Sequence, residues 1–316
     1  MTAPRLDRYE LPDPVVSLGN VQEIADDLVV IGDQRVPLVP NIGLVGGREA
    51  VLVIDTGIGR SNAETVLKFA TEYARGRKLY LTTTHFHPEH AFGAQVFADA
   101  ATYVTNRAQA DDLKNRGAGY LQMFRGLGET VARRLEDVEV AESDLAYDTT
   151  IHDLDLGGRI VRLEAAGQAH TMGDQLVRVP DADVLFTGDL AESGQFAIFP
   201  WFPPHDTDVS GLRWLALMQR LAADPAQTVV PGHGDIGGPE LLADVRDYLR
   251  MLRDETWKRR DSAMSEETIV EEVSAVMIAR RPEWEGREWL ATGVACLCSE
   301  YEHHRHDALG AHADGV

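Results

Sequence analysis

The stretch Thr82–His90, which reads TTTHFHPEH, decides the fold and places three histidines and one glutamate within six residues. A run of β-forming residues, Lys78–Thr83, leads into it and predicts a buried strand. From Glu89 onward the composition favours the start of a helix. The cluster therefore lies where a strand ends and a helix begins, which is the usual place for a site in an α/β sheet.

The side chains of this cluster are suited to binding metal. In an extended turn His85 and His87 point to the same side, because side chains alternate with a period of two. Pro88 fixes its own φ, so Glu89 and His90 are offset from the first pair, as a second ion would require. Imidazole and carboxylate are the ligands that zinc prefers outside thiolate sites. Packing alone does not explain such a cluster, so it predicts a metal site.

Three later strand-like segments each lead to one further ligand-type side chain. His170 follows the segment 159–163, Asp189 ends the segment 184–189, and His233 ends the segment 228–233. Neighbouring glycines let the backbone come close to an ion. The candidate metal ligands are therefore His85, His87, Glu89, His90, His170, Asp189 and His233.

With these residues in this order, the chain resembles the metallo-β-lactamase superfamily and is similar to its hydroxyacylglutathione hydrolase-type members. The resemblance covers residues 29–235: the family's His-x-His-x-Asp-His motif matches residues 85–90, and later motifs match His170, Asp189 and His233. Asp55 matches the family's acid after an early strand and is expected to accept the other ring proton of a ligand histidine. The implied fold is an α/β, four-layer αβ/βα sandwich.

One position departs from the family pattern, because Glu89 stands where the family usually has aspartate. The glutamate side chain is one methylene longer and reaches roughly 1.5 Å further. We expect Glu89 either to bind the second metal with a shifted geometry or to lie outside the ligand set, which would leave that metal weakly bound or absent.

The resemblance implies a zinc-dependent hydrolase that holds two Zn²⁺ ions, with iron or manganese as alternative metals. His85, His87 and His170 would hold one ion and Glu89, His90 and His233 the other, with Asp189 bridging. A metal-bound hydroxide would attack a carbonyl carbon, with Glu89 and Asp189 as the carboxylates of the catalytic site. Expected substrates are small, partly apolar molecules with an ester, thioester, lactone or β-lactam bond. The alternatives are a mononuclear iron persulfide-type dioxygenase and a non-catalytic metal-binding or partner-binding module.

An unusual segment, residues 196–205, follows Asp189 and combines aromatic residues with proline. Its composition favours neither a helix nor a strand. We expect it either to pack on itself as a surface loop or to form an apolar wall of the substrate pocket. The candidate pocket residues are Phe196, Phe199, Trp201, Phe202 and His205.

The composition limits the partners and the compartment. The 316 residues include 30 Lys and Arg against 51 Asp and Glu, a formal net charge of −21, so nucleic acid is not an expected partner. No apolar run is long enough for a membrane span and no signal peptide is evident, so the cytoplasm is the expected compartment. Cys296 and Cys298 are expected to be buried helix residues without a disulfide.

Four parts are expected along the chain. Residues 1–25 read as an irregular arm, residues 26–238 as the metallo-β-lactamase-type domain, residues 239–300 as a helical segment and residues 301–316 as a polar, histidine-rich tail. Within the domain, Ser61 is expected to cap a helix, and two helices are expected over 107–115 and 120–135. The C-terminal helices are expected to cover the site or to form a homodimer.

Overall fold

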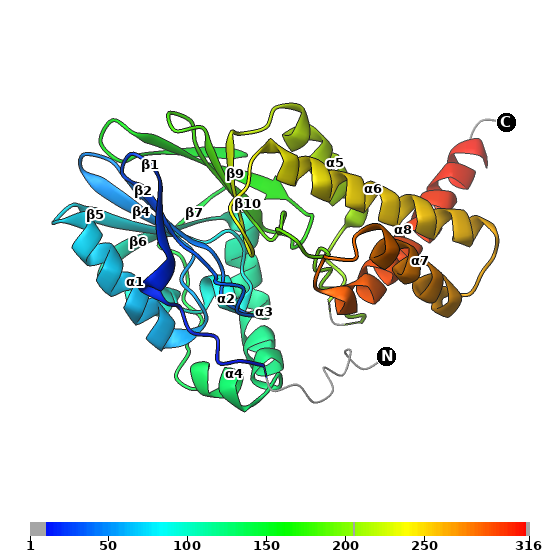
Figure 1. The fold of residues 1–316 in the computed structure, drawn as a ribbon, viewed down its shortest axis with the longest axis horizontal. Helices are drawn as coiled ribbons and strands as arrows, with labels where there is room; N and C mark the ends of the chain where they lie inside the picture. Colours follow the sequence, from blue (N-terminus) through cyan, green and yellow to red (C-terminus); the bar gives the residue numbers. More distant parts are fainter. Residues whose placement is uncertain (1–10, 205, 314–316) are drawn as a thin grey trace.

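The computed structural model describes residues 11–204 and 206–313, with residues 304–313 in backbone only. Two β-sheets pack face to face, and helices cover both outer faces (Figure 1). The predicted α/β, four-layer sandwich is therefore confirmed. The described helices include none that is long and apolar enough to cross a bilayer.

The first sheet contains seven strands in the order of the sequence. The strands from β1 to β4 pair antiparallel and those from β4 to β7 pair parallel. Their bounds are β1 (Val21–Ala25), β2 (Leu28–Ile31), β3 (Ile42–Gly46), β4 (Ala50–Ile54), β5 (Lys78–Thr82), β6 (Ala101–Asn106) and β7 (Leu145–Tyr147).

The second sheet has the order β12-β11-β10-β9-β8, in which only the β11–β12 pair is parallel. Its strands are β8 (Ile151–Asp155), β9 (Ile160–Gly167), β10 (Asp174–Val179), β11 (Val184–Gly188) and β12 (Thr228–Pro231).

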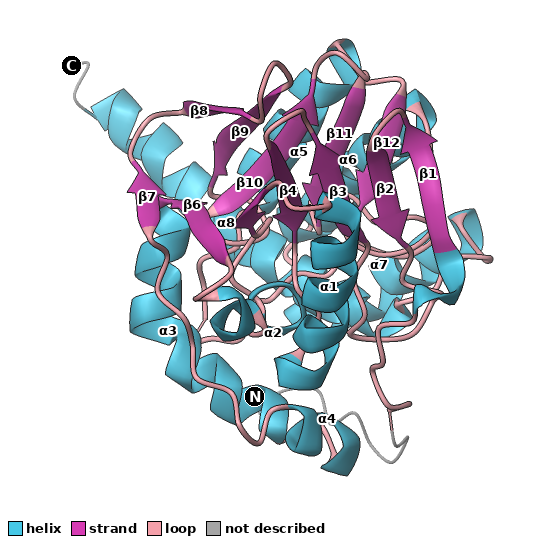
Figure 2. Cartoon of the chain, turned by 90° about the vertical axis from the view of Figure 1, so that its left-hand side faces the viewer, coloured by secondary structure: helices cyan, strands magenta, loops and turns pink. Residues whose placement is uncertain are grey.

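Strand β4 shows why the layers form. All five of its residues are apolar and buried, so both of its faces need cover. Val51 and Val53 belong to the core beneath the first layer of helices, whereas Leu52 and Ile54 belong to the core between the sheets. Helix α1 (Gly59–Ala74) lies in front of the strands in Figure 2, with α5 (Gly211–Ala223) and α6 (Pro239–Asp261) behind them.

The remaining helices are α2 (Pro88–Ala91), α3 (Arg107–Arg125), α4 (Glu129–Arg134), α7 (Glu266–Arg280) and α8 (Leu290–Ala313), with 3₁₀ turns η1 (Leu18–Asn20), η2 (Ala94–Phe97) and η3 (Arg287–Trp289). Helices α6, α7 and α8 form the helical segment expected after residue 238, although α8 continues past residue 300 into the expected tail. Cys296 and Cys298 are buried in α8 without a disulfide, as predicted. A homodimer through these helices stays a prediction.

Three local expectations were wrong. Within the expected arm, residues 21–25 form β1, because a tight turn at Asp27, with φ of 50°, returns the chain to pair with β2. Residues 1–10 of that arm lie outside the described residues. Helix α1 begins at Gly59, and the hydroxyl of Ser61 bonds Arg134 at 2.6 Å instead of capping the helix.

The third error concerns α3, which runs without a break from Arg107 to Arg125 where two helices were expected. Gly117 and Gly119 look like helix breakers in the sequence. Gly117 instead permits close packing, because a Cβ atom there would lie 2.8 Å from the side chain of Val140. This unbroken helix forms one wall of the cavity described below.

Candidate metal centre

All seven predicted ligand side chains meet at one edge of the sandwich. His85 and His87 lie after β5, Glu89 and His90 lie on α2, His170 precedes β10, Asp189 follows β11 and His233 follows β12. Their nitrogen and oxygen atoms form two groups, and within each group all of these atoms lie within 4.8 Å of one another. The first group is His85, His87, His170 and Asp189, and the second is Glu89, His90, Asp189 and His233.

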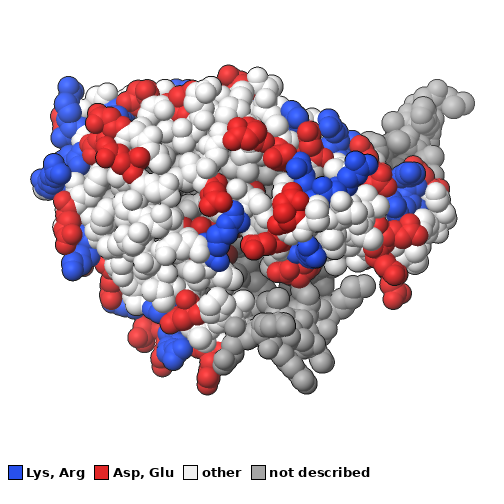
Figure 3. Space-filling model, in the orientation of Figure 1, with Lys and Arg blue, Asp and Glu red and all other residues white. Residues whose placement is uncertain are grey.

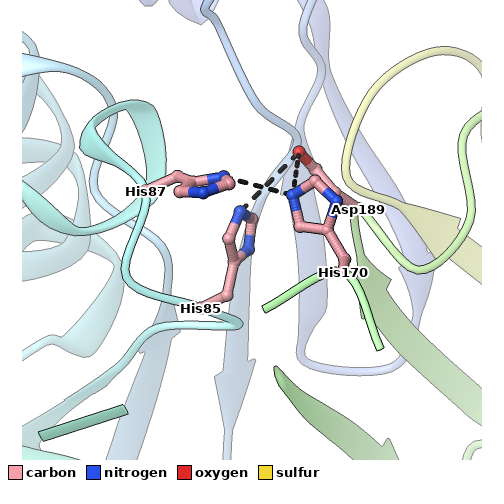
Figure 4. A group of neighbouring side chains, drawn as sticks. All are labelled: His85, His87, His170 and Asp189. Atoms are coloured by element: carbon pink, nitrogen blue, oxygen red, sulfur yellow. Dashed lines mark hydrogen bonds and ion pairs between the residues drawn. The ribbon is translucent and has the colours of Figure 1, made fainter. Parts of the chain in front are cut away.

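The three histidines of the first group point toward one another and toward Asp189 (Figure 4). Nε2 of His170 lies 3.1 Å from Nδ1 of His87, and Nε2 of both His85 and His170 lies 3.7 Å from Oδ2 of Asp189. Burial lowers the pKa of His85 and His87 well below the usual value and that of His170 to about 4. These imidazoles are therefore neutral at neutral pH, the form that binds metal.

The second group meets the other oxygen of Asp189. Nε2 of His90 lies 3.2 Å from Oδ1 of Asp189, and Nε2 of His233 lies 3.7 Å from the same atom. Asp189 thus turns one carboxylate oxygen to each group, as a bridging ligand must. Burial raises the pKa of Asp189, but the charges of His90, His233 and His85 outweigh burial and hold that pKa well below its usual value.

Glu89 is buried, and its Oε2 has no hydrogen-bond partner. Its carboxylate lies among the candidate ligand atoms of the second group, and its binding to a second metal stays a prediction. Because glutamate follows Pro88 at the start of α2, the longer side chain reaches the group from the first turn of the helix.

Neighbouring groups fix the orientation of the rings. Asp55 lies 2.9 Å from Nδ1 of His90, as expected, and also accepts a hydrogen bond from the backbone nitrogen of Thr84 at 2.7 Å. Nδ1 of His170 lies 2.9 Å from the carbonyl oxygen of Ile198, and Nδ1 of His233 lies 3.0 Å from that of Val39. These contacts leave the Nε2 atoms of the three rings facing the centre of the site.

Asp174 holds the loop that carries His170. It accepts hydrogen bonds from the backbone nitrogen of His170 at 2.7 Å and from the hydroxyl of Thr171 at 2.6 Å. Gly232 is needed for a different reason, because a Cβ atom there would lie 2.0 Å from Oδ1 of Asp189. The backbone around the site is therefore adjusted to the carboxylate that joins the two groups.

The unpartnered atoms of the site fit bound metal. Buried polar atoms without a hydrogen bond are rare, and each costs roughly 1–3 kcal/mol. Five such atoms belong to the predicted ligand side chains: Nε2 of His85, His87 and His90, Oε2 of Glu89 and Oδ1 of Asp189. Imidazole nitrogen and carboxylate oxygen suit a divalent transition metal, and two adjacent groups are available to hold it.

A cavity of about 330 Å³ opens onto both groups and is lined by His87, Glu89, Asp189 and His233. Most of its wall is apolar. One side is the end of α3, with Tyr120, Met123 and Phe124, followed by Leu127 just after the helix, and the other is the β2–β3 loop, with Val36, Pro37 and Leu38. The segment Glu285–Trp289, which joins α7 to α8, lines a third side. The C-terminal part therefore borders the cavity, in agreement with the expectation that it covers the site.

The aromatic segment contributes less to this cavity than the sequence indicated. Phe202 lines it, but Phe196 and Phe199 are fully buried in the core beneath α5 and α6. Trp201 is half-buried against the same core. His205 lies outside the described residues. Three of the four described aromatic candidates are therefore packing residues, because the segment folds inward beneath the C-terminal helices.

Tyr120 was missed, although it touches the site directly. Its ring stacks on that of His87 with centroids 5.1 Å apart, and its hydroxyl donates a hydrogen bond to Asp206. Arg116 pairs with the same carboxylate at 2.6 Å. Tyr120, Met123 and Phe124 have the spacing of one helix face, a signal that a single helix over 107–125 would have revealed.

Comparison with known proteins agrees with this architecture. Residues 35–233 match the metallo-β-lactamase superfamily model. The human acyl-coenzyme A thioesterase MBLAC2 is 27% identical over 222 residues, which cover 64% of this chain and 75% of that protein.

Solved structures show the same fold. A metallo-β-lactamase from Pontibacter korlensis superposes with a TM-score of 0.58 and 20% identity, over 73% of this chain and 98% of that one. A variant of the sec-alkyl sulfatase PisA1 superposes with a TM-score of 0.66 and 16% identity. The latter match covers 89% of this chain but 50% of the sulfatase.

The chain belongs to the metallo-β-lactamase superfamily. Its fold, its buried histidine and carboxylate groups and its thioesterase relative identify it as a metal-dependent hydrolase.

Proposed function

We propose that this hydrolase is zinc-dependent, holds two ions, and cleaves an acyl ester or thioester whose acyl part is apolar. The observation that carries the proposal is the position of Asp189, which joins two ligand groups at the end of a mainly apolar cavity. A second metal is supported by Glu89, whose unpartnered oxygen completes a second group of four.

The ligand side chains divide the work in this proposal. His85, His87 and His170 would hold one ion as neutral imidazoles, Glu89, His90 and His233 would hold the other, and Asp189 would contribute to both. When bound, the ions supply Lewis acidity and lower the pKa of water toward about 7, which provides a nucleophile near neutral pH. Asp55 keeps Nε2 of His90 aimed at the site by holding Nδ1.

The apolar walls favour acyl substrates. A carbonyl group held near His87, Glu89 and His233 would have its acyl chain along Tyr120 and the neighbouring residues of α3. Water adds across the carbon–oxygen or carbon–sulfur bond, so the products are a carboxylic acid and an alcohol or thiol. The thioesterase activity named for the human relative supports the thioester within this class.

Metal analysis and a substrate panel test this proposal. Protein prepared with zinc is expected to hold close to two ions per chain and to hydrolyse medium-chain acyl thioesters or esters. His170→Ala should abolish hydrolysis and remove one ion. His152→Ala is the control, because His152, on β8, stacks on Tyr147 of β7 and belongs to neither ligand group. One tightly held iron, or full activity in His170→Ala, would contradict the proposal.

A further inference from the structure

We propose that this site, if it is the acyl hydrolase proposed above, selects substrates whose leaving group carries no phosphate charges. The acyl chain lies between α3 and the β2–β3 loop, and the leaving group passes the segment Glu285–Trp289. Esters or thioesters of uncharged or cationic alcohols and thiols fit such a site, whereas coenzyme A esters are disfavoured.

The acyl side of the cavity is apolar and limited in size. Tyr120, Met123, Phe124 and Leu127 face Val36, Pro37 and Leu38 across it. The whole cavity has a volume of about 330 Å³, roughly eleven times the ~30 Å³ that a water-sized group occupies in a liquid, so an acyl chain and a large leaving group do not both fit inside it. An acyl chain of medium length fills this space, and the leaving group must extend outward.

The outer side of the cavity is acidic. Glu285 and Glu288 line it, are exposed, and form no ion pair with any described residue. Arg35 lines the same cavity, but its guanidinium bonds Asp235 at 2.7 Å and the carbonyl oxygen of Ser193 at 3.1 Å. The charge of Arg35 is therefore largely offset within the protein, and the carboxylates of Glu285 and Glu288 make the charge negative among the described residues that line this side.

The acidic segment is held firmly in place beside the metal centre. The backbone nitrogen of Glu285 bonds the carbonyl oxygen of Gly194, and the backbone nitrogen of Phe196 bonds the carbonyl oxygen of Glu285, both at 3.0 Å. Trp284 is buried against Phe196 and Tyr248. The backbone at Glu285 is therefore fixed against residues 194–196, which follow Asp189 closely in the chain, so the glutamate side chains start from a fixed position at the cavity.

The wider surface gives coenzyme A no compensating site on the face drawn in Figure 3. There the described Lys and Arg side chains are interspersed with Asp and Glu and form no continuous basic patch. The phosphates of coenzyme A would meet like charges at the cavity, and such repulsion is a common basis of specificity. An uncharged thiol such as N-acetylcysteamine, which has the same reacting end as coenzyme A, meets none.

Binding of two thioethers to the zinc-loaded protein tests the inference without requiring turnover. S-octyl-N-acetylcysteamine and S-octyl-coenzyme A share the alkyl chain, the sulfur and the cysteamine amide, and only the latter carries the pantothenoyl arm and the adenosine with its phosphates; the salt dependence of the binding ratio reports the contribution of the phosphate charges. Calorimetry at low salt is expected to show at least about tenfold tighter binding of the uncharged thioether, and this ratio should shrink as salt screens the charges.

Two matched variants locate the effect. The double variant Glu285→Gln/Glu288→Gln should reduce the ratio of the two dissociation constants by about threefold or more. The control Glu267→Gln/Glu271→Gln changes the net charge equally, but on exposed positions of α7 away from the cavity, and should leave the ratio unchanged. Equal or tighter binding of S-octyl-coenzyme A, failure of both thioethers to bind, or an equal effect of both variants would overturn the inference.

Hydrolysis of the two matching octanoyl thioesters separates this inference from the proposed function. If the thioethers discriminate as expected but neither thioester is cleaved, the selectivity stands and the proposed reaction fails. If both thioesters are cleaved with equal kcat/KM, the reaction stands and the selectivity fails.

Discussion

The two ligand groups share Asp189 but differ in what surrounds them. In the first group, only His87 and Asp189 line the cavity, and the pKa values of the three histidines are lowered by burial. In the second group, Glu89, His233 and Asp189 all line it. Burial lowers the pKa of His90, but the charges of Asp189 and Asp55 outweigh it and raise that pKa.

This difference separates two tasks. The first group has three neutral imidazoles, and only two of its four residues line the cavity, so under the proposed function it would hold its ion tightly. The second group contains the glutamate in place of aspartate, depends on the charge of Asp55, and faces the substrate. We therefore expect the second ion to bind more weakly and to respond more strongly to changes in neighbouring residues.

Removing the shared ligand should erase the difference. Asp189→Ala removes an oxygen from each group, so both ions should bind more weakly and activity should fall by more than about 100-fold. Elemental analysis after dialysis and a thioester assay measure the two effects. Retention of two ions would show that Asp189 does not bridge.

Shortening Glu89 should separate the groups. The Glu89→Asp side chain would end short of the second group, so the second zinc should bind about 10–100-fold more weakly while the first is unaffected. Zinc titration by calorimetry resolves the two steps, and added zinc should restore activity. Tighter binding of the second zinc would mean that Glu89 is not a ligand adapted to this site.

A smaller effect should follow from changing the cavity wall. Phe202→Ala shortens a side chain that lines the cavity, so KM for acyl substrates with long apolar chains should rise by roughly threefold to tenfold. Trp201→Ala is the matched comparison, because Trp201 packs against the core, and it should lower stability more than it changes KM. A larger change in KM for Trp201→Ala than for Phe202→Ala would indicate that Trp201 contributes to substrate binding.

The smallest effect is expected at Asp112, which lies on α3, the helix that carries Tyr120. Burial raises the pKa of Asp112 to about 6, although Arg116 opposes this. Because the folded pKa is above the unfolded one, the protein loses stability as pH rises from about 4 to 6 and this carboxyl ionises. Asp112→Asn removes that loss, so it should stabilise by about 1–2 kcal/mol at pH 7.5 and by nearly nothing at pH 4.

Urea unfolding of the metal-free protein at the two pH values measures this difference. Asp208→Asn is a suitable control, because Asp208 also pairs with Arg116 but is partly exposed. An equal gain at both pH values would show that packing, and not ionisation, limits stability at Asp112.

The sequence predicted the metal centre better than the cavity, and the reason is physical. The ligands come from strand ends and turns, where residue type and local spacing decide the geometry, so His85 to His90 could be placed directly. The cavity wall comes from α3, the β2–β3 loop and Glu285–Trp289, which lie far apart in the sequence. Their meeting depends on tertiary packing, which no local pattern reports.

The aromatic segment, residues 196–205, shows the same limit of local sequence patterns. Phe196 and Phe199 lie close to Asp189 in sequence, and their residue type suits a pocket as well as a core. Only the packing of Phe196 against Trp284 and of Phe199 against Trp214 decides between the two. Likewise, Gly117 reads as a helix breaker until Val140 is found against it.

The segment Glu285–Trp289 lies beyond residues 35–233, the part that matches the superfamily model, yet it borders the cavity. The ligand positions therefore lie in one stretch of the chain, and the segment proposed to select the leaving group lies in another. Exchange of the C-terminal stretch among relatives would give natural selection a way to change the substrate while the seven ligand positions stay as they are.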